Sequence, residues 1–280
     1  MQKFFEMLYG FTFSLLGITV DSNNFTNTIQ NLLDFNYLKN NFNLWGYVEN
    51  INQALVPVGL SLLTLFFFIN IIKMTQDGVE RITWERIVLK GAVFFMLVYF
   101  IQNSFTWFST IASVVQNSIL APVKASMSLA SVSSMSGIPE QLAAICEAEG
   151  GIKQYLYAAL FLILAIPYLA TIIMILSQVF LRAIKLLIYM MISPIPIALA
   201  AEGETFRGKA ISFFMNFTGV CFEAVVIYIG LFVYAKGLSG LGTNLNGGIS
   251  LIISIMFMNG LFSAVIGLAG QLSKEFFGRG

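Results

Sequence analysis

Apolar runs of membrane-spanning length recur along the chain from residue 53 onward. An α-helix needs about 20 mostly apolar residues to cross the hydrocarbon core of a bilayer. Five runs approach or exceed this length, and they cover residues 54–72, 91–108, 155–181, 211–234 and 249–272. The pattern therefore predicts an all-α fold, a polytopic transmembrane helix bundle with five full spans.

A further apolar segment, residues 186–201, is short and contains Ser193, Pro194 and Pro196. Proline has no N–H, so it frees the carbonyl that a helix would have paired with that group. Such broken backbone is tolerated at membrane depth only where it is buried in protein or lines water. We expect either a re-entrant segment, which dips into the membrane and returns, or a short, kinked span packed in the bundle.

The regions that flank the apolar runs are more polar and suggest domain boundaries. We expect an external or interfacial region at residues 1–52, the bundle at 53–273 and a cytoplasmic tail at 274–280. Residues 4–20 are apolar, and three forms stay open for them: an interfacial or interior helix, an extra span, or a cleaved signal. Residues 121–151, rich in Ser, Ala and Met, are predicted to form an external loop.

The composition of the chain indicates a membrane protein and excludes several classes of functional site. Hydrophobic residues make up 58% of the chain and charged residues 10%, with a mean hydropathy of +0.82. Histidine is absent, which excludes Ser-His-Asp and Cys-His catalysis, histidine-ligated zinc and histidine proton relays. The net charge of +1 offers no basic tract for nucleic acid. We expect a non-catalytic protein without a cofactor, in which Cys146 and Cys221 are free thiols.

The distribution of basic residues favours one of the two forms of the 186–201 segment, because cytoplasmic loops are enriched in Lys and Arg. A full crossing places 7 of the 15 basic residues inside, and a re-entrant segment places 10 of them inside. The larger set is Lys73, Arg81, Arg86, Lys90, Arg182, Lys185, Arg207, Lys209, Lys274 and Arg279. We therefore predict a multi-pass protein of the cell membrane with its N-terminus outside and its C-terminus in the cytoplasm.

One carboxylate, Glu223, lies well inside an apolar run. Helical spacing places it on one face with four other residues: Ser212, Asn216, Gly219 and Gly230. A charge at the bilayer centre costs about 2.5–3.5 kcal/mol on insertion scales, so Glu223 should be protonated, paired or exposed to water. Two interpretations stay open, a carboxylate that lines a pore or couples to an ion, and a neutral Glu that locks the bundle through hydrogen bonds; we favour the lock.

Two further stripes of residues follow helical spacing. Gln102 and Thr106 begin a polar stripe that continues through Ser109, Ser113 and Gln116. It either lines an aqueous vestibule or extends past the bilayer surface. Small residues form a helix-packing seam on the last run, and they are Gly260, Ser263, Ala264, Gly267 and Gly270. Such seams let helices approach closely, within one chain or between copies.

Basic residues also suggest cytoplasmic docking positions. Arg81 and Arg86 belong to a loop of alternating charge between Lys73 and Lys90, which is either a solvated face or a contact for a cytosolic motor. Arg182 and Lys185 share one face at the inner end of the third long run, where long basic side chains commonly extend to the membrane surface.

The stretch from Arg182 through Tyr228, and above all SPIPIALAAEGETFRGKAISFFMNFTGVCFEAVVIYIG, resembles the TrbL-type polytopic subunit of conjugative type IV secretion systems. It is most similar to the short forms carried by mobile elements of Gram-positive bacteria, and the resemblance covers most of residues 50–275. Its motifs are soft, and the family offers no catalytic residues to carry over.

The resemblance implies a membrane channel or scaffold subunit that forms a homo-oligomer among membrane lipids. It would contact other secretion subunits, including cytosolic ATPases, and help to pass a DNA–protein substrate, without a basic patch of its own. A secondary transporter or small-solute permease is the alternative, although the sequence has no internal repeat of the kind that transporters commonly carry.

Overall fold

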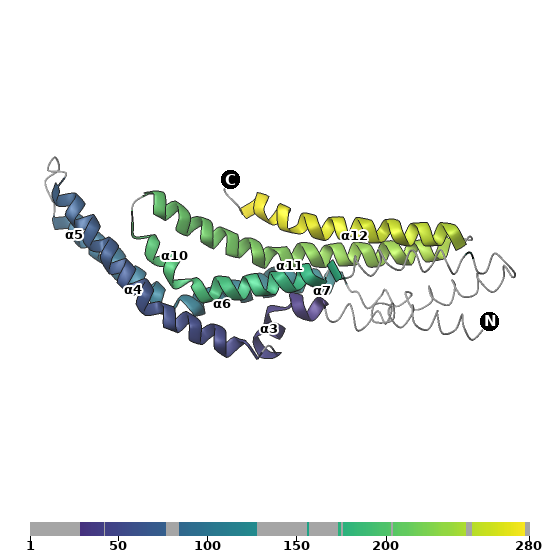
Figure 1. Ribbon diagram of the computed structural model, residues 1–280, viewed down its shortest axis with the longest axis horizontal. Helices are drawn as coiled ribbons and strands as arrows, with labels where there is room; N and C mark the ends of the chain where they lie inside the picture. Colours follow the sequence, from purple (N-terminus) through teal and green to yellow (C-terminus); the bar gives the residue numbers. More distant parts are fainter. Residues whose placement is uncertain are drawn as a thin grey trace. The chain divides into compact units, whose positions relative to one another are not determined.

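The computed structural model describes residues 29–41, 43–76, 84–127, 156, 173–174, 176–202, 204–244 and 248–277 (Figure 1). All regular elements within these residues are helices, which confirms the predicted all-α class for the described part. The chain divides into two units. One unit, which we call the α4 unit after helix α4 (Trp45–Gln76), comprises Phe35–Ser118, Arg182–Phe222 and Leu272–Gly280. The other, which we call the α12 unit after helix α12 (Gly248–Phe277), comprises Met1–Asp34, Ile119–Leu181 and Glu223–Gln271.

Helix α4, Trp45–Gln76, contains the first predicted span. Its segment Trp45–Lys73 has a mean hydropathy of 2.3 and is long and apolar enough to cross a membrane. The short helix α3, Phe35–Asn41, precedes it. The predicted domain boundary between residues 52 and 53 falls inside α4, because the polar residues at the start of this helix continue its hydrogen-bonding pattern.

The second predicted span, residues 91–108, is not a single helix. Helix α5, Trp84–Gln102, ends before Asn103, and α6, Ser104–Val115, begins after it. The helical segments on either side of Asn103 are bent by 71°. The Asn103 side chain donates to the Tyr99 carbonyl at 3.0 Å, beside the Asn103 backbone N–H at 3.1 Å, and such side-chain bonds to the carbonyl four residues earlier often bend helices. Hydropathy alone does not reveal such a break.

Helical structure continues beyond α6 into the region predicted as an external loop. A π-helical turn, Gln116–Leu120, leads into α7, Ala121–Ser126. Residues 121–126 are therefore helical, and most of the remaining predicted loop, with Cys146, lies outside the described residues.

The Pro-containing segment is a broken helix. Residues 176–192 are helical, Ser193 forms a turn, and α10 covers Pro194–Leu199. The predicted runs 155–181 and 186–201 join without a break, because the helix continues through Arg182 and Lys185. A turn at residues 200–202 then leads toward α11, Glu204–Asn244.

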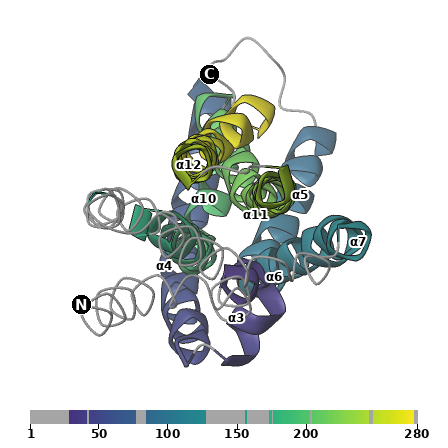
Figure 2. The ribbon, with the colours of Figure 1, turned by 90° about the vertical axis from the view of Figure 1, so that its right-hand side faces the viewer.

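Helix α11 contains another predicted span, since its segment Phe206–Val233 has a mean hydropathy of 1.8 and suits a membrane crossing. Helix α12, Gly248–Phe277, contains the last predicted run, and it extends into the predicted tail. In the α12 unit these two helices lie side by side, as Figures 1 and 2 show.

The described residues thus hold two helices that could cross a membrane, or three if the bent α5–α6 pair forms one span. Five full spans are not supported. The prediction failed at residues 91–108 because an apolar run need not be one straight helix, and most of residues 155–181 lie outside the described part.

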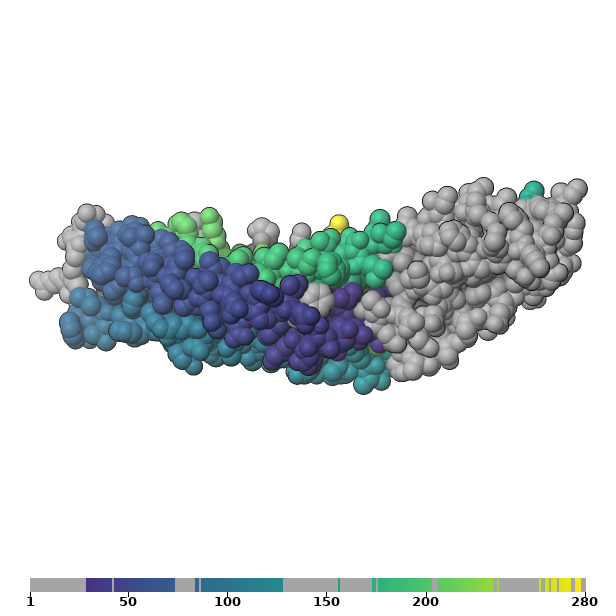
Figure 3. Space-filling view, turned by 60° about the horizontal axis from the view of Figure 1, so that its bottom comes forward, coloured from purple at the N-terminus to yellow at the C-terminus, as the bar shows by residue number. Residues whose placement is uncertain are grey.

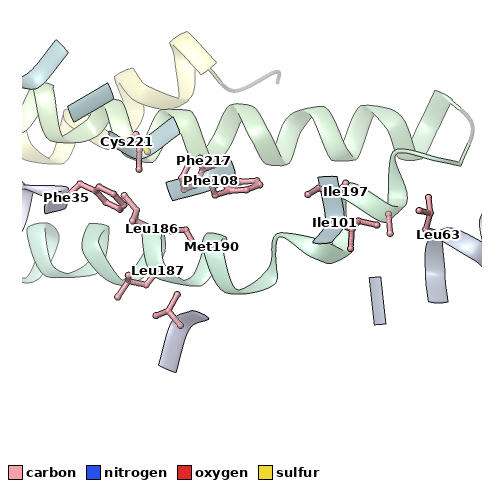
Figure 4. Close-up of a cluster of buried hydrophobic side chains, with 13 residues drawn as sticks. Phe35, Leu63, Ile101, Phe108, Leu186, Leu187, Met190, Ile197, Phe217 and Cys221 are labelled. Carbon is pink, nitrogen blue, oxygen red and sulfur yellow. The ribbon is translucent and has the colours of Figure 1, made fainter. Parts of the chain in front are cut away.

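Helix α4 organises the α4 unit. It packs against α5 and α10, and Figure 3 shows it between the green 176–199 segment and the blue-green α5 and α6. The apolar core behind it centres on Phe108, whose ring lies 4.7 Å from that of Phe217 and 5.0 Å from that of Phe214. Figure 4 shows Leu186 and Met190 approaching this cluster from the 176–192 helix.

Candidate functional site

Three buried polar side chains meet inside the α4 unit, and we call Asn52, Ser104 and Ser193 the polar junction. They belong to α4, to the start of α6 and to the turn before α10. Each is at most 1% exposed. The junction therefore joins a continuous helix to the two places where the neighbouring helices break.

Asn52 supplies the hydrogen bonds that Pro194 cannot make. In an uninterrupted helix the N–H of residue 194 would bond to the Met190 carbonyl, and proline has no N–H. The Asn52 Nδ2 donates to this oxygen at 2.7 Å, and the Ser193 Oγ donates to it at 3.0 Å. The broken backbone is thus satisfied by protein, as expected for a break buried in an apolar environment.

The second break, between α5 and α6, is bonded to the same Asn52 side-chain amide. The Asn52 Oδ1 accepts a hydrogen bond at 3.2 Å from the Oγ of Ser104, the first residue of α6. The Asn52 Nδ2 also lies 2.9 Å from the Ser193 Oγ and 3.4 Å from the Met191 carbonyl. A single side chain on α4 therefore fixes both breaks.

The junction is one end of a stripe along α4, which we call the α4 stripe: Asn52, Gly59, Leu63 and Asn70. Their spacing of seven, four and seven places them on one helix face. At the far end, the Asn70 Nδ2 donates to the Ala201 carbonyl at 2.8 Å. Between the ends, Gly59 allows close approach, because a Cβ there would lie 2.9 Å from the Pro194 carbonyl oxygen.

These contacts define the path of residues 186–201 along α4. The segment follows α4 from Asn52, which binds Met190, to Asn70, which binds Ala201. Asn52 and Asn70 are five helical turns apart, or about 27 Å. The segment is therefore a kinked helix packed along α4, and its placement in the membrane, re-entrant or spanning, stays a prediction.

Arg182, predicted as a docking residue, is instead an interior residue. Its side chain is 3% exposed, and its Nε donates to the Val220 carbonyl of α11 at 3.0 Å. The prediction failed because an Arg in an apolar run can bind a neighbouring helix as well as extend to the surface. Lys185 is exposed. Arg81 and the side chain of Arg86 lie outside the described residues.

Glu223 is buried, with 6% of its surface exposed, and it meets the predicted small-residue seam. Its Oε1 would lie 3.4 Å from a Cβ on Gly270. The other end of the seam is open, because a Cβ on Gly260 or Gly267 would meet no atom of the described chain within 4 Å. Ala264 is exposed, and the Ser263 Oγ lies 3.2 Å from the Met174 sulfur.

The remaining predicted polar residues are mostly outward-facing. Asn216, Gln102 and Thr106 are exposed, and Ser212 is half-buried. The end of the polar stripe is different, since Gln116 is buried and its Oε1 accepts a hydrogen bond from the Phe35 N–H at 3.4 Å. Cys221 is a buried free thiol.

Sequence reasoning missed Asn52, Ser104 and Asn70. The available signal was the Met190 carbonyl that Pro194 must free, an acceptor open to side-chain donors such as those of Ser193 and Asn52. The polar junction holds no titratable side chain, so its arrangement supports a structural role. Comparison with protein-family models, with curated proteins and with solved structures gives no match to this chain.

Proposed function

We propose that this protein is a non-catalytic channel or scaffold subunit of a conjugative type IV secretion system and works as a homo-oligomer in the cell membrane. The assignment to this machine rests on the resemblance of residues 182–228 to TrbL-type subunits. The oligomer rests on surfaces that the described part of one chain leaves uncovered.

The open end of the seam on α12 is the observation that carries the oligomer. Gly260 and Gly267 are exposed, with no described atom near the position of a Cβ. In a membrane, small residues favour helix association by letting two backbones approach closely. Exposed polar side chains on apolar helices, among them Asn216 and Gln102, add surfaces that a second copy would shield from lipid.

The orientation follows from basic residues gathered at one end of the α4 unit. Lys90 and Arg207 line a common cavity, and the nearby Asn70 binds Ala201. Because Lys and Arg concentrate on the cytoplasmic side, we assign this end to the cytoplasm and the start of α4 to the outside. Contacts with cytosolic ATPases would then form near the α10–α11 turn.

Deletion of the gene from its mobile element tests the function. Transfer of the element should stop, while growth and solute uptake stay unchanged, and a plasmid copy should restore transfer. Normal transfer in the deletion strain would reject the proposal.

A secondary transporter remains the second candidate, because transporters commonly build their sites from discontinuous helices. The breaks at Asn103 and Ser193 are such discontinuities. The groups at the Ser193 break are bonded to Asn52, which favours a structural use. Lost solute uptake with normal transfer in the deletion strain would select the transporter.

A further inference from the structure

The α4 unit contains a cavity of about 290 Å³ between α4, α5 and the α10–α11 turn. This volume is close to the lower limit of ordinary small-ligand sites. One wall is apolar and consists of side chains from α4 and α5, including Phe67, Val93, Phe94 and Leu97. An apolar wall of this kind can pack against the hydrocarbon part of a ligand.

A second part of the cavity lining is polar and charged. Asn70, Lys90, Glu202 and Arg207 line it. Lys90 is half-buried and Arg207 is exposed, and neither forms an ion pair with any residue in the described ranges. The hydrogen bond from Asn70 to the Ala201 carbonyl holds the α10–α11 turn against α4 and so fixes this part of the lining.

The charges specify the kind of ligand. Among the described lining residues, two cations and one carboxylate give a formal charge of +1, which matches a phosphodiester with one negative charge better than a free phosphate with two. The Glu202 carboxylate can accept hydrogen bonds from headgroup hydroxyls. The guanidinium of Arg207 offers the planar set of donors that recognises phosphate oxygens.

We propose that this cavity binds the phosphodiester headgroup of an acidic phospholipid. Lys90 and Arg207 hold the phosphate, Glu202 accepts from the headgroup hydroxyls, and the glycerol and first acyl carbons lie along the Phe67–Phe94 wall. The rings of Phe67 and Phe94 lie 4.6 Å apart, so this wall is packed before a lipid arrives. The proposal does not rest on the secretion role, and it can hold or fail separately.

The test measures lipid binding to the full chain, purified in a neutral detergent, by native mass spectrometry. The probes are phosphatidylglycerol and phosphatidylcholine, with inorganic phosphate as a competitor. The site variant is Lys90→Gln with Arg207→Gln. Its matched control is Lys73→Gln with Lys209→Gln, which removes the same charge from exposed residues that do not line the cavity.

Wild-type protein and the control variant should bind one phosphatidylglycerol at least about tenfold more tightly than phosphatidylcholine, and the site variant should lose this preference. Val93→Trp should weaken phosphatidylglycerol binding by filling the cavity with no change in charge. Equal loss in the site and control variants, or an unchanged preference in the site variant, would overturn the proposal. Displacement of the lipid by equimolar inorganic phosphate would assign the site to free phosphate and reject the lipid.

Discussion

The Asn52 amide of α4 lies 2.7 Å from the Met190 carbonyl oxygen, the acceptor that Pro194 leaves without its helical donor. A proline and an asparagine far apart in the sequence thus form one structural unit. Each accounts for the other, since the kink requires a donor and a buried Asn requires acceptors.

Replacing Asn52 with Leu should destabilise the protein by about 1–3 kcal/mol, because the buried Ser104 hydroxyl loses its acceptor and the Met190 carbonyl keeps only the Ser193 donor. Thermal unfolding in detergent measures the loss. Gln53→Leu, at the exposed neighbouring position, is the control and should be nearly neutral. In a Pro194→Ala background, which restores the backbone donor, Asn52→Leu should be less damaging. An equal effect in both backgrounds would contradict the pairing of Asn52 with Pro194.

Gly59→Ala should destabilise the protein because the new Cβ would lie 2.9 Å from the Pro194 carbonyl oxygen, a backbone atom that cannot rotate away. Gly46→Ala on the same helix has no atom of the described chain within 4 Å, and it should be neutral or stabilising by up to about 1 kcal/mol. The melting temperatures of the two variants should therefore shift in different directions. Similar shifts would argue against close packing of α4 on α10.

Glu223→Gln should leave assembly and transfer nearly unchanged if Glu223 acts as a neutral lock, because Gln retains its volume and hydrogen-bonding capacity. If the lock acts through hydrogen bonds to a neighbouring helix, worth about 0.6–2 kcal/mol each, Glu223→Leu should impair assembly. Conjugation frequency and the amount of assembled protein are the readouts. Loss of transfer by an assembled Gln variant would instead show that the carboxylate charge is used.

Gly267→Leu should weaken self-association without unfolding the chain, since no described atom lies within 4 Å of its Cβ position. Native mass spectrometry of wild type and variant, with melting temperatures alongside, separates the two effects. A stable monomer in the wild type across detergents and lipids would contradict the proposed oligomer, and an unfolded variant would place the seam inside one chain.

Cysteines at Leu44 and Lys209 should be labelled from opposite sides of the membrane by an impermeant maleimide. Both positions are exposed. A Cys146→Ser background removes one of the two native thiols, and the other, Cys221, is buried. In intact cells, Leu44→Cys should react and Lys209→Cys should react only after lysis. The reverse pattern would invert the proposed orientation.

The apolar runs predicted the positions of α4 and α11 well, because run length and hydropathy determine whether a helix can cross a bilayer. They did not predict the bend at Asn103, where a polar side chain inside an apolar run bonds to the carbonyl four residues earlier. The freed carbonyl before Pro194 was predictable from proline chemistry alone. Its donor was not, because Asn52 lies 138 positions from Met190.

Arg182 and Asn70 illustrate the same limit. Each sits in a run whose composition fits a membrane helix, and nothing local distinguishes a side chain that extends to the surface from one that binds a neighbouring helix. The distinction depends on which carbonyl lies opposite, Val220 for Arg182 and Ala201 for Asn70. Only the packing of the helices supplies this information.

The α4 stripe constrains the length of this helix as well as its composition. One residue inserted between Asn52 and Asn70 would rotate everything beyond it by about 100° and turn one of these amides away from α10. Substitutions on the outward faces of α4 do not change the rotation of Asn70 relative to Asn52 about the helix axis, even when many are combined. Homologous chains should therefore vary freely in sequence along α4, yet keep the number of residues between the two asparagine positions fixed.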